Sequence, residues 1–90
     1  MSETIYLEVT YRKGKPLAAY IHLPGPADAR SIRCTQPGPG LVVDYAADGH
    51  PIGIEIYEPS CVTIAQINEL LAGLGFPQMP AEDLAPALAS

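Results

Sequence analysis

The chain has 90 residues, of which 48% are hydrophobic and 17% charged, and its formal net charge is −5 at pH 7. This composition is typical of one small globular domain and excludes an intrinsically disordered chain. No apolar run approaches the roughly 20 residues of a membrane-spanning helix, and the N-terminus lacks the basic and apolar regions of a signal peptide. We therefore expect a cytoplasmic protein without membrane contact.

The charges are unevenly distributed along the chain. All five basic residues precede residue 34, whereas residues 34–90 contain seven acidic residues and no Lys or Arg. Because phosphate binding requires a basic surface, we expect no direct contact with nucleic acid. The acidic half favours a basic protein partner through electrostatic steering, although acids also simply keep a small domain soluble.

The two cysteines, Cys34 and Cys61, are separated by 27 positions and lack metal-ligand spacing. We expect them to be reduced and mostly buried, as small apolar residues are. Neither His22 nor His50 has a cysteine near it in sequence, so no metal site and no cofactor is predicted.

Two paired strands are predicted at the N-terminus. Apolar and polar residues alternate over residues 5–11 and again over 17–23, which is the period of a half-buried strand. Residues 12–16 read as a polar turn, so the two strands form an antiparallel hairpin. The alternation places Tyr20 and His22 together on one face of the sheet.

The middle of the chain predicts further strands. Residues 29–35 are a weaker strand candidate, and residues 37–40 read as a loop. The clearest signal follows, where Asp48-Gly49 separates the alternating apolar runs 41–45 and 52–57.

Three loop lengths are open for this second hairpin. A two-residue loop pairs Val43 with Ile54, and a four-residue loop pairs Val43 with Ile52. A three-residue loop requires a β-bulge to keep the apolar residues on one face. Asp44 and Glu55 then lie on the opposite, more open face.

A helix follows the strands. Thr63 and Gln66 have the spacing of a capping box, and apolar residues recur at helical spacing from Ile64 to Leu74. Residues 77–90 are a tail, either a short helix or disordered. We predict an α+β fold with a single domain over residues 1–76. It consists of a small antiparallel, meander-like sheet of four to five strands, one amphipathic helix packed on the apolar face, and the tail.

Three segments carry a family resemblance. They are Tyr11 before the first turn, the strand Ala18-Ala19-Tyr20-Ile21-His22-Leu23, and the hairpin that runs from Val42-Val43-Asp44-Tyr45 to Gly53-Ile54-Glu55-Ile56. Over roughly residues 5–72 the chain resembles the uncharacterised domain-of-unknown-function family 2283. The resemblance implies a small sheet with a helix and no established activity, and some such proteins look like the small partner of toxin–antitoxin pairs. Arg12 and Leu17 stand where the family has acids, so no role of those acids carries over.

The open face of the predicted sheet holds the candidate site, whose residues are Tyr20, His22, Asp44, Glu55 and Tyr57. Tyrosine-rich faces are favoured at protein interfaces, although such residues also occur as ordinary half-exposed sheet positions. Two carboxylates on neighbouring strands also suit acid–base chemistry or cation binding. The sequence has no accompanying nucleophile, phosphate loop or metal-spaced cluster.

We therefore expect a non-enzymatic protein-interaction module. Its partner is a second copy of the chain or a basic protein such as a small toxin. The alternatives are a small metal-dependent hydrolase and a ligand-sensing domain, both using Asp44 and Glu55.

Overall fold

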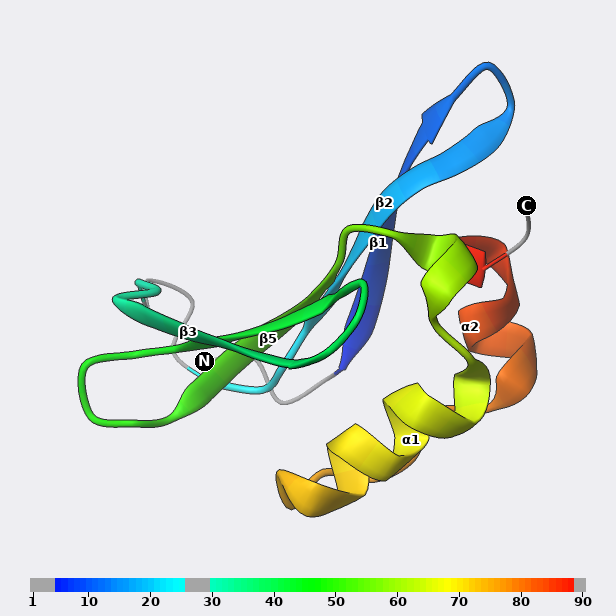
Figure 1. Cartoon of the computed structure of the whole chain (residues 1–90). Coiled ribbons are helices and arrows are strands. Elements are labelled where there is room, and N and C mark those ends of the chain that lie inside the picture. The colour runs from blue at the N-terminus through cyan, green and yellow to red at the C-terminus, as the bar shows by residue number, and fades with distance from the viewer. Residues whose placement is uncertain (1–4, 26–29, 89–90) are drawn as a thin grey trace.

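A computed structural model of the chain describes residues 5–25 and 30–88. It confirms the α+β class: five antiparallel strands form an open sheet, and two helices pack on one of its faces (Figure 1). The elements in chain order are β1 (Tyr6–Arg12), β2 (Lys15–His22), β3 (Arg33–Gly38), β4 (Leu41–Tyr45), β5 (Pro51–Ile56), the 3₁₀ turn η1 (Pro59–Cys61), α1 (Ile64–Gly73) and α2 (Ala81–Leu88).

The strand order is β1-β2-β5-β4-β3, so the sheet is a meander only within β1–β2 and within β3–β4–β5. β5 lies in the centre of the sheet, and its residues Gly53, Ile54 and Ile56 are buried there. β3 lies at an edge and is exposed over almost its whole length. Such an exposed strand suits a sheet edge. Pro37 has no backbone N–H to donate, and an edge strand tolerates this because one of its sides has no partner strand. The strand predicted over residues 29–35 is displaced: it begins at Arg33 and extends into the expected loop, and residue 29 lies outside the described residues.

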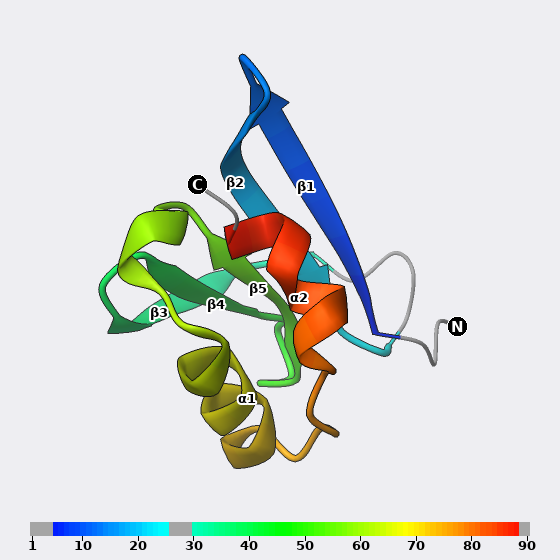
Figure 2. The same ribbon diagram turned by 90° about the vertical axis from the view of Figure 1, so that its right-hand side faces the viewer.

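The first hairpin is longer than the predicted polar turn allows. Only Lys13 and Gly14 form the loop, with φ angles of 53° and 77°, and both positive values fit the two-residue turn that matches the strand twist. Arg12 pairs directly with Lys15. The end of this hairpin therefore projects beyond the rest of the domain (Figures 1 and 2). Tyr11, which alternation assigns to the apolar face, lies on this projection and is exposed, because the projection extends beyond the helices that cover that face.

The second hairpin has Val43 paired with Ile54. Its loop nevertheless has three residues, 47–49. The amide of Ala46 donates to the carbonyl of His50 at 2.8 Å, and the last loop residue is a glycine with φ of 88°. This is the three-residue hairpin in which a glycine takes the left-handed position.

A β-bulge reconciles this loop with the register. Tyr45 pairs with Pro51 while Asp44 pairs with Gly53, so Ile52 is an additional residue in β5. The extra residue restores the alternation that an odd loop would otherwise reverse. The apolar residues of both strands consequently remain on the face that the helices cover.

α1 begins and ends as its sequence predicts. The side chain of Thr63 accepts a hydrogen bond from the amide of Gln66 at 3.2 Å, and the side chain of Gln66 accepts one from the amide of Thr63 at 2.8 Å. At the other end, Gly75 has φ of 89°, and the amide of Phe76 donates to the carbonyl of Leu71 at 2.9 Å. These contacts satisfy backbone groups that a bare helix terminus leaves unpaired.

The predicted tail contains a second helix, α2, which packs on the same face as α1 (Figure 2). Leu84 and Ala87 are fully buried. The connection between the helices is fixed by Asn68, whose side chain donates to the carbonyl of Met79 at 2.9 Å and accepts from its amide at 2.7 Å. Two helices, and not one, therefore cover the apolar face.

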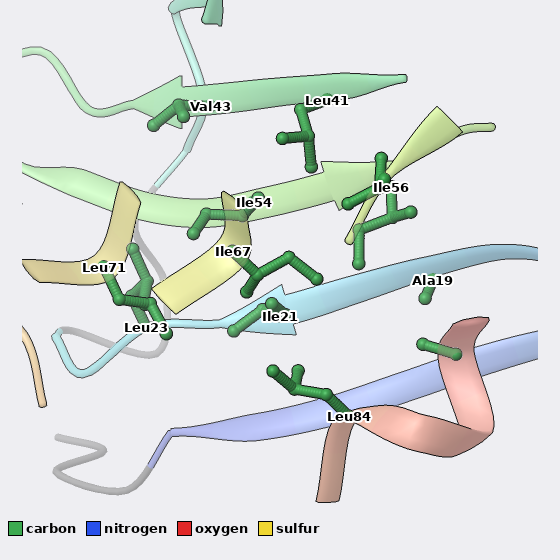
Figure 3. Close-up of a cluster of buried hydrophobic side chains, with 12 residues drawn as sticks. Ala19, Ile21, Leu23, Leu41, Val43, Ile54, Ile56, Ile67, Leu71 and Leu84 are labelled. Atoms are coloured by element: carbon green, nitrogen blue, oxygen red, sulfur yellow. The ribbon is translucent and has the colours of Figure 1, made fainter. Parts of the chain in front are cut away.

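The core lies between the sheet and these helices (Figure 3). Its buried members are Ala19, Ile21, Leu23, Leu41, Val43, Ile54, Ile56, Val62, Ile67, Leu71, Leu84 and Ala87. The expectation that the cysteines join this core is wrong, because both are exposed. Cys34 lies on the edge strand β3, and after η1 the buried position is taken by Val62 and not by Cys61.

Replacing Leu84 with alanine tests whether α2 belongs to the cooperative unit. We expect the free energy of unfolding in urea to fall by about 3 kcal/mol, because a fully buried leucine leaves a cavity when truncated. Glu69→Ala, an exposed change on α1, is the control and should change it by less than about 0.5 kcal/mol. A loss for Leu84→Ala no larger than that of the control would place α2 outside the cooperative core.

Candidate functional site: the open face of the sheet

The face of the sheet opposite the helices, called here the open face, brings the candidate residues together. Its residues are Tyr6 and Glu8 of β1, Tyr20 and His22 of β2, Gly53 and Glu55 of β5, Val42 and Asp44 of β4, Cys34 and Gln36 of β3, and Tyr57 after β5. Four of the five predicted site residues lie side by side at its centre, and Tyr57 lies beyond the end of β5. Asp44 and Glu55 share the open face, as the sequence predicts, and Asp44 is opposite Gly53 and diagonal to Glu55.

A tyrosine crosses the central strand of this face. The hydroxyl of Tyr20 on β2 donates a hydrogen bond to Oδ2 of Asp44 on β4 at 3.0 Å, although β5 lies between the two strands. The side chain can pass because position 53 is glycine: a Cβ there would lie 1.9 Å from the tyrosine hydroxyl. Gly53 is therefore required by the close approach of a side chain, and Tyr20 covers the gap that glycine leaves in the sheet.

The environment of Tyr20 keeps its hydroxyl protonated. Burial raises the pKa of Tyr20 well above its ordinary value of 10.0, and the hydrogen bond to Asp44 and the negative charges of Asp44 and Glu55 raise it further. At neutral pH the hydroxyl is consequently a fixed hydrogen-bond donor. It does not provide a base or a nucleophile.

His22 is held on three sides. Its ring stacks on Tyr6 with centroids 4.2 Å apart and meets the edge of Tyr20 at 4.7 Å. The carboxylate of Glu8 accepts a hydrogen bond from the imidazole Nε2. These contacts connect β1 to β2 and use the ring that sequence analysis proposed for a functional role.

Tyr57 makes a further contact between side chains. Its hydroxyl accepts a hydrogen bond from the side-chain amide of Gln36 on β3, while its backbone amide donates to Gly40 in the turn between β3 and β4. The three side-chain contacts together link β1 to β2, β2 to β4 and β3 to the end of β5. The open face is thus a connected and ordered surface.

The two carboxylates at the centre are not part of a larger ligand cluster. Within residues 5–25 and 30–88, no three His, Cys, Asp or Glu side chains are grouped to hold a metal ion. One oxygen of Asp44 is engaged by Tyr20. Hard cations take six or more oxygen ligands, and this pair of residues supplies few of them.

Two hollows on the surface lie away from the candidate residues. One of about 500 Å³ lies between α1 and the turn from β3 to β4, where Pro37, Leu41 and Leu70 contribute to its walls. The other, of about 360 Å³, is lined in part by Ile5 and Met79. Neither hollow includes Asp44 or Glu55.

Sequence reasoning missed some residues of the open face. Glu8 was detectable, because the alternation of residues 5–11 places it on the same face as Tyr6, but its contact with His22 requires the pairing of β1 with β2. Gln36 had no detectable signal, since the register of β3 against β4 shifts between Thr35 and Gly38.

The geometry defines a small α+β domain with one helix-covered sheet face and one open, hydrogen-bonded face. Among known families, the model described as a protein of unknown function, DUF2283, matches residues 18–60. This match confirms the sequence resemblance over a shorter segment than residues 5–72. No curated protein and no solved structure matches the chain. In the part of the chain that the structure describes, neither helix is long and apolar enough to cross a membrane.

The matched segment explains the resemblance physically. It extends from β2 to η1 and contains the whole crossing of Tyr20 over Gly53 to Asp44. The Gly-Ile-Glu-Ile segment alternates between this crossing and the core: Gly53 and Glu55 lie on the open face, whereas Ile54 and Ile56 are buried. The residues that carry the resemblance therefore include those that join three adjacent strands.

Adding a methyl group at position 53 tests the crossing. We expect Gly53→Ala to lower the free energy of unfolding by about 2 kcal/mol, because Tyr20 must leave its position to relieve the overlap. In a Tyr20→Ala background the same change should cost less than half as much, since the overlap is absent. Equal costs of Gly53→Ala in the two backgrounds, measured by urea denaturation, would contradict a steric role for Tyr20.

The raised pKa of Tyr20 makes stability depend on pH in the alkaline range. The unfolded chain releases the tyrosine proton near pH 10 while the folded chain retains it, so the folded state binds more protons there. Stability from this group is complete below about pH 10 and falls as pH rises above it, by at most about 1.4 kcal/mol per pH unit. We expect Tyr20→Phe to flatten this decline between pH 9.5 and 11.5. The exposed control Tyr11→Phe should leave it unchanged, and an identical decline in all three proteins would contradict the assignment.

Proposed function

We propose that the chain is a non-enzymatic protein-interaction module that binds a protein partner through its open face. The main support is that aromatic side chains on this face are held in place by contacts within the chain and are nevertheless exposed to solvent. Tyr6 and Tyr57 have fixed contacts and are still 48% and 42% exposed. Aromatic side chains that are already immobilised lose little conformational entropy on binding, which favours them as interface anchors.

Most polar side chains at the centre of the open face already have partners within the chain, which supports binding over catalysis. A general base or nucleophile needs a free, suitably titrating group within reach of a substrate. Tyr20 donates to Asp44, and His22 is packed between tyrosines and bonded to Glu8. Of the pair Asp44 and Glu55, Asp44 already accepts a hydrogen bond from Tyr20 at one oxygen, which a hydrolase built on the two carboxylates would have to accommodate.

The charge of the face indicates the kind of partner. The open face has three carboxylates, those of Glu8, Asp44 and Glu55, and the chain as a whole has a net charge of −5. A basic protein surface is the complementary partner, and steering by opposite charge accelerates such association. An antitoxin-like role toward a small basic toxin agrees with this charge. The exposed thiols of Cys34 and Cys61 suit the reducing cytoplasm.

Site-specific photo-crosslinking in cells that produce the full chain tests this function. A benzoylphenylalanine at Tyr6 or Tyr57 replaces one exposed aromatic ring by another on the open face, and the same residue at Glu69 on α1 is the matched control. We expect a protein adduct, identified by mass spectrometry, from the two open-face positions and none from the control. The absence of adducts from both open-face positions, or equal adducts from all three positions, would refute the proposal.

A further inference from the structure

The end of the β1–β2 hairpin is unlike the rest of the domain. Residues 11–17, called here the arm, contain Arg12, Lys13 and Lys15, three of the five basic residues of the chain. They also contain two large apolar side chains that are exposed, Tyr11 at 55% and Leu17 at 50%. Cations next to exposed apolar side chains are typical of a binding surface.

The arm is an extension of the sheet. After a register shift between Thr10 and Tyr11, its ladder continues to the Arg12–Lys15 pair, and a two-residue loop closes it. It projects away from the helices and from the centre of the sheet (Figures 1 and 2). Because the arm continues the same two strands that carry Glu8 and Tyr20, it cannot turn back onto the open face of its own chain.

The open face has the charge and surface chemistry that complement the arm. Glu8 is bonded to His22 and its side chain is still 68% exposed. Glu55 is also exposed and lies in the same row of the sheet, on the far side of Tyr20. Exposed Tyr6 offers apolar area next to these carboxylates. The carboxylates on this face match the cations of the arm.

We propose that the partner of the open face is a second copy of this chain, and that each copy lays its arm on the open face of the other. The inference rests on the proposed function and specifies its partner. Lys13 lies five residues beyond Glu8, roughly 17 Å along the strand. Two copies can face each other with their open faces in contact and their β1 strands antiparallel. If they are offset so that Lys13 of each copy lies opposite Glu8 of the other, the arm of each copy lies on the open face of its partner.

Such an arrangement closes as a two-fold dimer. Each contact occurs twice, because the arm and the face of one copy meet the face and the arm of the other. Both arms and both open faces are then buried in the dimer, so no binding surface remains for a third copy. A nucleic-acid ligand for the arm is disfavoured, since the acids on the adjoining face repel phosphates.

Charge reversal on the full-length chain tests the dimer by sedimentation velocity at 50 mM and 500 mM salt. We expect the natural chain to be dimeric at low salt, and high salt to weaken the dimer by about tenfold or more. Lys13→Glu/Lys15→Glu and, separately, Glu8→Lys/Glu55→Lys should each give monomers. The control Glu69→Lys/Glu82→Lys, on the helices, makes the same change in net charge as the face variant and should remain dimeric.

Mixing the two charge-reversed proteins gives the decisive result. The arm variant has an acidic arm and an acidic face, whereas the face variant has a basic arm and a basic face. Together they restore both arm–face contacts, so we expect a heterodimer from two monomers. If the face variant does not fold, as judged by circular dichroism, the arm variant and the salt dependence of the natural chain decide the question.

Several outcomes would overturn the inference. These are a natural chain that is monomeric at all concentrations, a dimer that survives reversal of the arm, and salt-sensitive binding of duplex DNA by a monomer through the arm. The proposed function is judged separately by crosslinking. An open-face adduct with a different protein retains that function and removes the second copy as partner, whereas no open-face adduct removes both.

Discussion

The passage of Tyr20 across Gly53 to Asp44 is the interaction on which the arrangement of the sheet depends. It joins β2, β5 and β4 by one side chain. It is possible only when His22 is opposite Gly53 and Gly53 is opposite Asp44, so it favours a single register for all three strands. A slip by one residue would expose the apolar face and also place a side chain under the tyrosine ring.

The alternation of side chains along the strands gives the two faces of the sheet different roles. Ile54 and Ile56 are buried under α1, α2 and η1, while Gly53 and Glu55 alternate with them on the open face. Hydrophobic burial stabilises the first face, and hydrogen bonds and ring contacts order the second. Tyr20, Asp44, His22 and Glu8 on the open face take part in these contacts.

Charge is segregated within the molecule, and this segregation is the basis for its proposed self-recognition. The arm holds Arg12, Lys13 and Lys15, and the carboxylates of Glu8, Asp44 and Glu55 lie on the open face of the same sheet. The β1–β2 ladder places the two regions at different distances along the same strands. In the proposed dimer, the attraction between them acts between two molecules.

Local sequence signals determined much of this protein. The alternation of the strands and the capping box of Thr63 and Gln66 follow from neighbours in the chain. The same signals placed Tyr20, His22, Asp44 and Glu55 on one face, because side-chain direction in a strand is fixed by its period of two.

The tertiary structure decided the remaining features. The position of β5 beside β2, the packing of α2, the exposure of both cysteines and the contact of Gln36 with Tyr57 depend on segments distant in sequence. Tyr11 shows the difference clearly: its alternation indicates an apolar face, but the hairpin carries it beyond the reach of the helices. Periodicity specifies the direction in which a side chain points, whereas burial depends on which other element lies there to cover it.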